Sequence, residues 1–166
     1  MPFRLREDAR KWFAEIEGRP PVKTQFDLFY FCLLAGLTSG RHSNPTHGGR
    51  AAPEFLPPSG TFIEDYRPAQ RLIIGLLIVA ELQRLGINLE EKVSVRKTIQ
   101  TLVDPQSPTN LTVEGLRMLN AYASGGYDYI SEMRGSKPYT VEEFLRDFVG
   151  LVGKAATDNP GWAAQA

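Results

Sequence analysis

The residues best suited to chemistry gather in one segment, "GLTSGRHSNPTHGGRAAPEF", which spans Gly36 to Phe55. It holds two histidines, His42 and His47, and two arginines, Arg41 and Arg50, among four glycines. Imidazole groups can bind a metal or activate a nucleophile, and guanidinium groups can bind anions. The segment is therefore the first place to look for a site.

A metal site in this segment is not predicted. His42 and His47 lie five residues apart, with Glu54 nearby, but a structural zinc ion needs four ligands. The chain has no third histidine, and its single cysteine, Cys32, lies in an apolar run. We predict neither a metal nor another cofactor.

A hydrolytic site is also not predicted. Hydroxyl side chains lie near the histidines at Ser39, Ser43 and Thr46, but the chain lacks the "GxSxG" pattern that places a serine nucleophile on a sharp turn. The glycines do not form a phosphate-binding loop, because no Gly-Lys-Ser or Gly-Lys-Thr follows them. We predict no catalytic residues, and a hydrolase that uses the two histidines is the second alternative.

Arginines in and just beyond this segment are better candidates for binding. Four of them fall within a short stretch of the chain, and guanidinium groups suit two-pronged contacts with phosphate or carboxylate. These four arginines, together with His42 and His47, are predicted to bind an anion, nucleic acid or a protein partner. The arginines are Arg41, Arg50, Arg67 and Arg71. The other interpretation is a solvated loop, in which Glu64 and Asp65 pair with the arginines.

Two further groups of residues could form surfaces. Tyr122, Tyr127 and Tyr129 cluster around the Gly125-Gly126 pair and, with Trp162, are predicted as a possible interface; a core with polar tips fits equally well. The cations Lys92, Arg96 and Lys97 are predicted to lie on a solvated helix face.

Overall composition limits where the protein works. Its 166 residues carry 19 basic and 19 acidic side chains, so no net field would draw it to DNA or to a membrane surface. The longest apolar run, Leu72 to Ala80, is too short to span a bilayer, and the charged N-terminus lacks the apolar core of a signal peptide. With one unpaired cysteine, the protein is predicted to be cytoplasmic.

The elements that must position these residues are helices. Apolar residues recur at spacings of three and four, which predicts an all-α fold of about six helices in one compact domain, residues 1–157, with a flexible tail over 158–166. Three helices are predicted to begin after caps at Thr24, Thr112 and Thr140. The others are predicted at Glu7 to Glu17, from Pro68 to a stop at Gly86, and at Leu89 to Val103. A long loop over 39–66 separates the second helix from the third.

Two stretches indicate a family. "FDLFYFCLLAGLTSGRHS" (Phe26 to Ser43) and "LNAYASGGYDYISEM" (Leu119 to Met133) resemble segments of the small Dnd-system-associated proteins, in particular their fourth class. Where this resemblance leads us to expect a second arginine after Arg41, the chain has His42. The resemblance implies a bacterial setting beside DNA phosphorothioation and restriction genes used against phage, and it implies no active site.

These observations lead to one functional prediction with two alternatives. The chain is predicted to be a non-enzymatic accessory or adaptor subunit of a bacterial DNA-modification or antiviral defence system, acting through contacts with other proteins. Direct DNA binding through the arginine-rich loop is the first alternative. The partner and the oligomeric state do not follow from the sequence.

Overall fold

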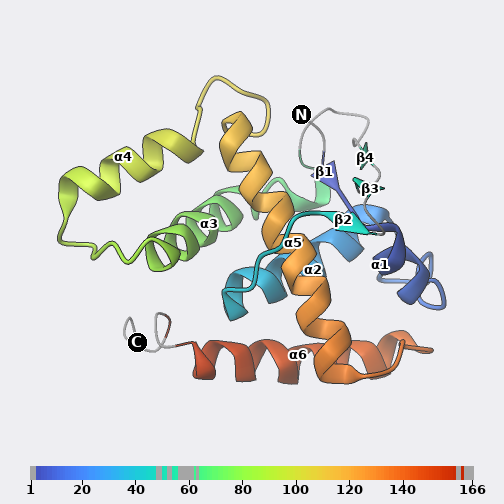
Figure 1. Ribbon diagram of the computed structural model, residues 1–166. Helices are drawn as coiled ribbons and strands as arrows, with labels where there is room; N and C mark the ends of the chain where they lie inside the picture. The colour runs from blue at the N-terminus through green and yellow to red at the C-terminus, as the bar shows by residue number, and fades with distance from the viewer. Residues whose placement is uncertain are drawn as a thin grey trace. The chain divides into compact units, whose positions relative to one another are not determined.

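The computed structural model describes residues 3–47, 50–51, 54–55, 62, 64–159 and 162. This part of the chain is mostly helical, which confirms the all-α prediction (Figure 1). Its six α-helices are α1 (Glu7–Trp12), α2 (Gln25–Ser39), α3 (Gln70–Arg84), α4 (Lys92–Leu102), α5 (Val113–Arg134) and α6 (Val141–Asp158). Its remaining elements are β1 (Phe3–Arg4), β2 (Thr46–His47), β3 (Arg50–Ala51), β4 (Glu54–Phe55) and the 3-10 helix η1 (Glu64–Tyr66).

The predicted caps begin three of the helices. The Thr24 hydroxyl accepts from the Asp27 N–H while Asp27 accepts from the Thr24 N–H, a complete capping box at α2. The hydroxyls of Thr112 and Thr140 accept from N–H groups three residues later, at α5 and α6. Local side-chain chemistry therefore sets these helix starts, as predicted.

The first helix and the long loop differ from the prediction. Helix α1 ends at Trp12 instead of Glu17, because residues 13–18 form a series of tighter turns that closes at Gly18, whose φ is 84°. Within the loop, β2 and β3 pair antiparallel, with Thr46 opposite Ala51. The intervening sequence is Gly48-Gly49, a dipeptide favoured in two-residue hairpin loops.

The chain divides into two compact units. One comprises residues 1–3 and 56–119 and is called the α3–α4 unit; the other comprises residues 4–55 and 120–166 and is called the α2–α6 unit. The boundary falls within α5, after residue 119. Each unit is compact by itself, and a single domain over residues 1–157 stays a prediction.

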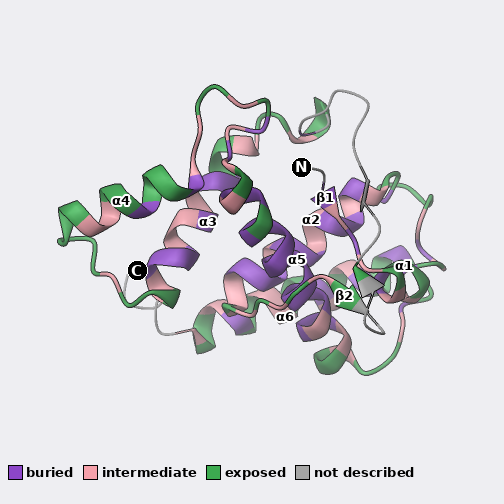
Figure 2. Cartoon of the chain, turned by 45° about the horizontal axis from the view of Figure 1, so that its top comes forward, coloured by how far each residue is buried: buried purple, intermediate pink, exposed green. Residues whose placement is uncertain are grey.

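Helices α2, α5 and α6 build the core of the α2–α6 unit. Most of α2 is buried, including Cys32, and burial raises the pKa of this thiol (Figure 2). Helix α6 packs against α2, with the rings of Phe144 and Phe148 edge-on to Phe31. Helix α2 is therefore central to its unit, in keeping with its apolar residues on nearly every side.

The Gly125-Gly126 pair neither splits nor ends α5, which runs through it for 22 residues. A Cβ on Gly126 would lie 1.7 Å from the Cys32 carbonyl oxygen, so α2 and the residue 120–134 part of α5 touch through their backbones. A Cβ on Gly125 would lie 2.5 Å from the backbone of Arg41. Each glycine therefore admits a different neighbour: α2 at Gly126 and the loop after α2 at Gly125.

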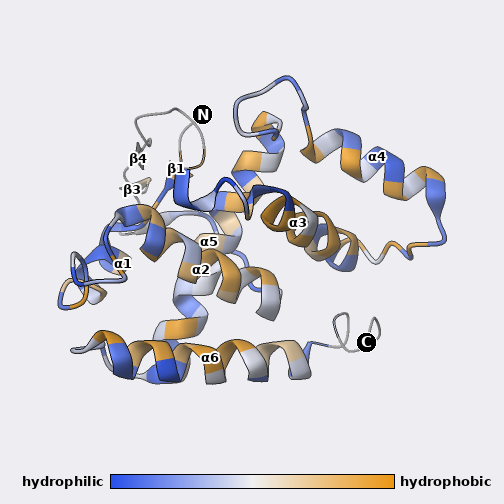
Figure 3. Cartoon of the chain, turned by 180° about the vertical axis from the view of Figure 1, so that it is seen from behind, coloured by the Kyte–Doolittle hydropathy of each residue, from blue (hydrophilic) through white to orange (hydrophobic). Residues whose placement is uncertain are grey.

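In the α3–α4 unit the two helices differ sharply. Helix α3 is rich in hydrophobic residues and buries Ile73 and Leu77, whereas α4 alternates hydrophilic and hydrophobic residues and buries only Thr98 and Leu102 (Figures 2 and 3). Helices α3 and α4 pack together. Among the described residues, no helix combines the length and apolarity that crossing a membrane requires.

Candidate functional site

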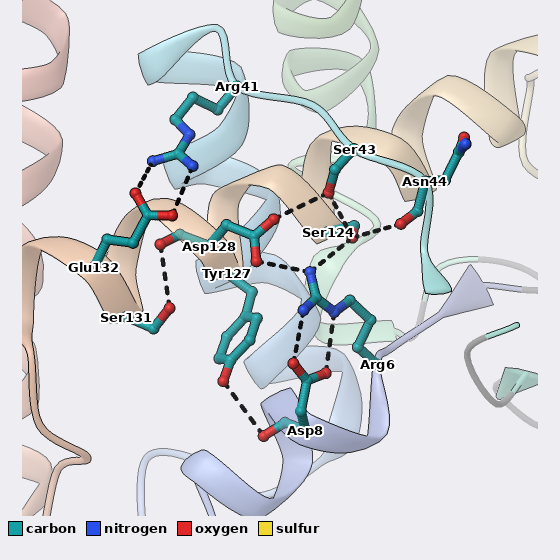
Figure 4. Close-up of polar contacts among 10 residues, drawn as sticks. All are labelled: Arg6, Asp8, Arg41, Ser43, Asn44, Ser124, Tyr127, Asp128, Ser131 and Glu132. Atoms are coloured by element: carbon teal, nitrogen blue, oxygen red, sulfur yellow. Dashed lines mark hydrogen bonds and ion pairs between the residues drawn. The ribbon is translucent and has the colours of Figure 1, made fainter. Parts of the chain in front are cut away.

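Arg41, the leading site residue of the sequence, is engaged inside the α2–α6 unit. Its guanidinium donates to both carboxylate oxygens of Glu132 on α5, at 2.6 and 3.0 Å (Figure 4). This bond raises the pKa of Arg41 and lowers the pKa of Glu132, so both groups stay charged at neutral pH. The Arg41 guanidinium, which was predicted to bind an anion, therefore already makes a bidentate contact with a carboxylate of the same chain.

A second arginine, which the sequence did not single out, organises a larger network beside it. Arg6 donates to both Asp8 oxygens, at 3.0 and 2.6 Å, and to Asp128 Oδ1 at 2.7 Å (Figure 4). Its guanidinium also lies 5.1 Å from the centre of the Tyr127 ring, and its side chain is only 12% exposed. Arg6 thus ties the N-terminal segment to α5.

Two serines extend the network to the loop after α2. Ser43 Oγ lies 2.9 Å from Ser124 Oγ and donates to Asp128 Oδ2 at 3.1 Å, while Ser124 donates to the Asn44 carbonyl (Figure 4). A serine beside an aspartate lacks the imidazole base that activates a hydroxyl nucleophile. The nearest candidate base, His42, is exposed and rests its ring against Tyr122 instead. The network therefore fastens the loop to α5.

The other predicted binding residues are not assembled with Arg41. His47 and Arg50 face each other across the β2–β3 pair, but their side chains lie outside the described part of the structure. Arg67 and Arg71 belong to the α3–α4 unit, where both are exposed and neither forms an ion pair with a described residue. The sequence neighbourhood of the four arginines thus does not become one described cluster.

The three tyrosines belong to the core, which corrects the prediction of a possible interface and agrees with its alternative, a core with polar tips. Tyr122 is fully buried, while Tyr127 and Tyr129 are 8% and 9% exposed. The Tyr127 ring packs against Trp12 and Phe13, and the Tyr129 hydroxyl donates to the Leu151 carbonyl. Trp162, predicted as part of the same possible interface and of the flexible tail, is docked: its indole N–H donates to the Leu37 carbonyl at 3.3 Å.

Polar pockets and metal ligands offer little chemistry. A cavity of about 230 Å³ beside Arg41 also contains Asp158, whose negative charge opposes anion binding. No group of three or more histidine, cysteine, aspartate or glutamate side chains among the described residues is arranged to hold a metal ion.

A groove in the α3–α4 unit is lined mainly by apolar surface. It has a volume of about 320 Å³ and lies between the end of α3, one face of α4 and the start of α5. Leu85, Ile87 and Leu102 give it apolar walls. The α4 face consists of residues spaced as one side of a helix: Ser94, Lys97, Thr98 and Thr101.

The groove is more apolar than these side chains suggest. The hydroxyls of Thr98 and Thr101 donate to carbonyls four residues earlier in α4, at 2.9 Å each. Their hydrogen-bonding capacity is therefore partly used within the helix. Val93, one turn before Lys97 and 83% exposed, lies next to this face.

Sequence reasoning missed this groove because it treated α4 as a solvated charged face. One signal could have found it. Val95, Ile99 and Leu102 make a regular apolar stripe, and Val93 lies off that stripe, among the cations. An apolar residue on the charged side of an amphipathic helix indicates a second apolar contact.

Comparison with known proteins found no relative of this chain. No family model, curated protein or solved structure matches the chain. The resemblance to Dnd-system-associated proteins thus stays a prediction.

Proposed function

We propose that this chain is a non-enzymatic adaptor that binds another protein through its α3–α4 unit. The observation that carries the proposal is the concentration of exposed large apolar side chains there. Nine such side chains are exposed among the described residues, and three of them lie in the α2–α6 unit: Met133, Tyr139 and Val149. The other six lie in the smaller unit: Leu72, Leu85, Leu89, Val93, Ile99 and Val113.

Exposed apolar surface of this kind is typical of protein interaction sites. Single exposed apolar residues are ordinary, but an apolar groove with exposed apolar side chains at its edge favours association because burying them releases water. Leu85, which is 50% exposed, lines the groove, and Val93, which is 83% exposed, lies next to its α4 face. The setting in antiviral defence and the cytoplasmic location remain predictions attached to this adaptor role.

Direct DNA binding has less support from the structure than from the sequence. Of the predicted arginines whose side chains are described, Arg41 is held by Glu132, which leaves Arg67 and Arg71 free to meet phosphate. Two contacts add little affinity at physiological salt, since each phosphate contact contributes about one unit to the salt slope. A hydrolase would need a nucleophile beside His42, whose ring contacts Tyr122.

Partner capture from the native host tests the adaptor role. We expect the wild-type chain to retain a specific protein that a Val93→Asp variant loses at least tenfold. Val149→Asp is the matched control, because Val149 is similarly exposed, at 71%, but lies on α6 in the other unit. Both variants should fold, since neither side chain is buried. Equal capture by wild type, Val93→Asp and Val149→Asp would contradict the proposal.

A further inference from the structure

We infer that the groove between α3 and α4 takes an amphipathic helix that carries acidic side chains beside its apolar stripe. This inference rests on the proposed adaptor function and names the chemistry of the partner. It follows from the form of the groove, from its apolar walls and from the charges along its α4 edge.

The form of the groove favours a helix over an extended strand. Its long wall is the face of α4 from Ser94 to Thr101, which rises about 10 Å, or two helical turns. An added strand needs a free sheet edge with unpaired backbone groups, and the helices that border this groove have none to offer. Two helices that pack against each other contact through residues spaced by three and four, and the lining positions 94, 97, 98 and 101 have this spacing.

The apolar walls suit the apolar stripe of such a helix. Leu85 is half exposed at the end of α3, and Val93 stands 83% exposed at the edge of the α4 face. The volume of about 320 Å³ holds a few apolar side chains, at the lower end of the roughly 300–1,000 Å³ seen for ligand pockets.

Among the charged side chains that line the groove, the positive charge is left without a described counter-charge at one position. Glu81 accepts two hydrogen bonds from Arg84, and Glu114 accepts two from Arg117, so both lining carboxylates are neutralised locally. Lys97 lines the groove and forms no ion pair with the part of the chain that the structure describes. Within α4 there is no acidic residue.

The acidic residues that flank α4 in the sequence do not cancel this charge. Glu90 and Glu91 precede the helix, and Glu91 accepts from a backbone N–H three residues earlier; Asp104 follows the helix and accepts from a backbone N–H two residues later. Lys97 lies in the middle of the groove face, at least one full turn along the chain from each of them. Of the cations that line the groove, Lys97 alone lacks a counter-charge in the described part of the chain. A partner carboxylate beside Lys97 would supply that counter-charge, which would make binding more specific and association faster.

A displayed peptide library tests the inference with the full-length chain. The library would hold peptides of about 16 residues, or four to five turns, with Leu fixed either at helical spacing or at alternate positions and all other positions randomised. We expect selection to enrich the helical spacing, with Asp and Glu prominent at the randomised positions.

Charge reversal at the groove provides the matched comparison. Lys97→Glu should weaken the enriched peptides at least tenfold and shift a repeat selection toward Lys and Arg. Lys92→Glu makes the same change on the same helix at a position that does not line the groove, so it should change affinity less than threefold. Both side chains are exposed, and both variants should fold.

Several results would overturn the inference. These are enrichment of the alternating pattern, no preference for acidic peptides, and equal effects of the two reversals. Binding of small apolar compounds without any enriched peptide would assign the groove to a small ligand, and a dimer that Lys97→Glu dissociates would assign it to a second copy. If Val93→Asp loses host-protein capture but the library does not enrich the helical spacing, the helical partner is disproved and the adaptor role stands. If capture by Val93→Asp is unchanged, the adaptor role itself is disproved.

Discussion

The α2–α6 unit and the α3–α4 unit use their helices differently. In the first, α2 and α5 approach until their backbones touch at Gly36 and Gly126, and nearly every large side chain between them is buried. In the second, α4 leaves most of its residues exposed and borders an apolar groove. Close backbone packing leaves no room for a partner, whereas a loosely covered helix retains surface for one.

Charged groups follow the same division. Arg6, Arg41 and Arg134 each form ion pairs within the α2–α6 unit, with Arg134 held by both Glu143 and Asp147. The α4 cations and Arg67 instead face outward from the α3–α4 unit. In the α3–α4 unit, Arg84 and Arg117 pair with carboxylates three residues away on the same helix. The comparison indicates that the described ion pairs join distant segments in the α2–α6 unit, whereas in the α3–α4 unit they stay within single helices and leave the α4 cations exposed.

Adding one carbon at the tightest contact should produce the largest effect. In Gly126→Ala the new Cβ would meet the Cys32 carbonyl oxygen at 1.7 Å, and neither backbone can move without disturbing the helix pair. We expect the free energy of unfolding to fall by about 4 kcal/mol or more in urea titrations.

Gly150→Ala on α6 is the control for this variant. Nothing lies within 4 Å of the position a Cβ would take, so alanine should stabilise the helix by about 0.5–1 kcal/mol. Similar free energies for the two alanine variants would show that the α2–α5 contact is looser than the structure indicates.

Truncating one core leucine in each unit should have the next largest effect. Leu33 of α2 is 1% exposed and Leu77 of α3 is fully buried. Leu33→Ala and Leu77→Ala should each cost about 2–5 kcal/mol of unfolding free energy. Urea titrations followed by two probes, one in each unit, would measure both losses and show whether the units unfold together. A loss below about 1 kcal/mol at either site would mean that its helix is not core.

Alkaline pH should destabilise the α2–α6 unit through Tyr127. Burial raises the pKa of this phenol to about 12 from its ordinary value of about 10. Between these values the unfolded chain releases the proton and the folded chain keeps it, so stability falls as pH rises. The loss should reach about 2 kcal/mol, and Tyr127→Phe should lack it. Urea titrations of both proteins at about pH 9 and pH 12 measure this, and parallel pH dependences would disprove it.

The smallest effect is expected at Arg41. Its pair with Glu132 is exposed, so Arg41→Ala should leave the free energy of unfolding unchanged within error. Any DNA binding should also be unchanged in an Arg41→Ala, Arg50→Ala double variant, whereas Arg67→Ala with Arg71→Ala should reduce the salt slope by about two units. A salt series of duplex DNA binding measures this. Tight DNA binding lost in the first double variant would restore the DNA-binding alternative.

Much of the fold was predictable because its signals are local. The caps at Thr24, Thr112 and Thr140 act within one helical turn, and apolar spacing of three and four identifies a buried helix face without knowledge of its neighbour. The candidate site was less predictable. The binding residues Arg41 and His42 were chosen by their place in the sequence, but Glu132, which engages Arg41, lies 91 residues away.

The sequence by itself determined the helical class and the starts of α2, α5 and α6, because these depend on residue type and short-range spacing. Only the tertiary structure decided that Gly125 and Gly126 admit neighbours without breaking α5, that the tyrosines are core, and that α3 and α4 leave a groove open. The physical reason is that packing and ion pairing depend on which side chains meet, and these partners lie many residues apart along the chain.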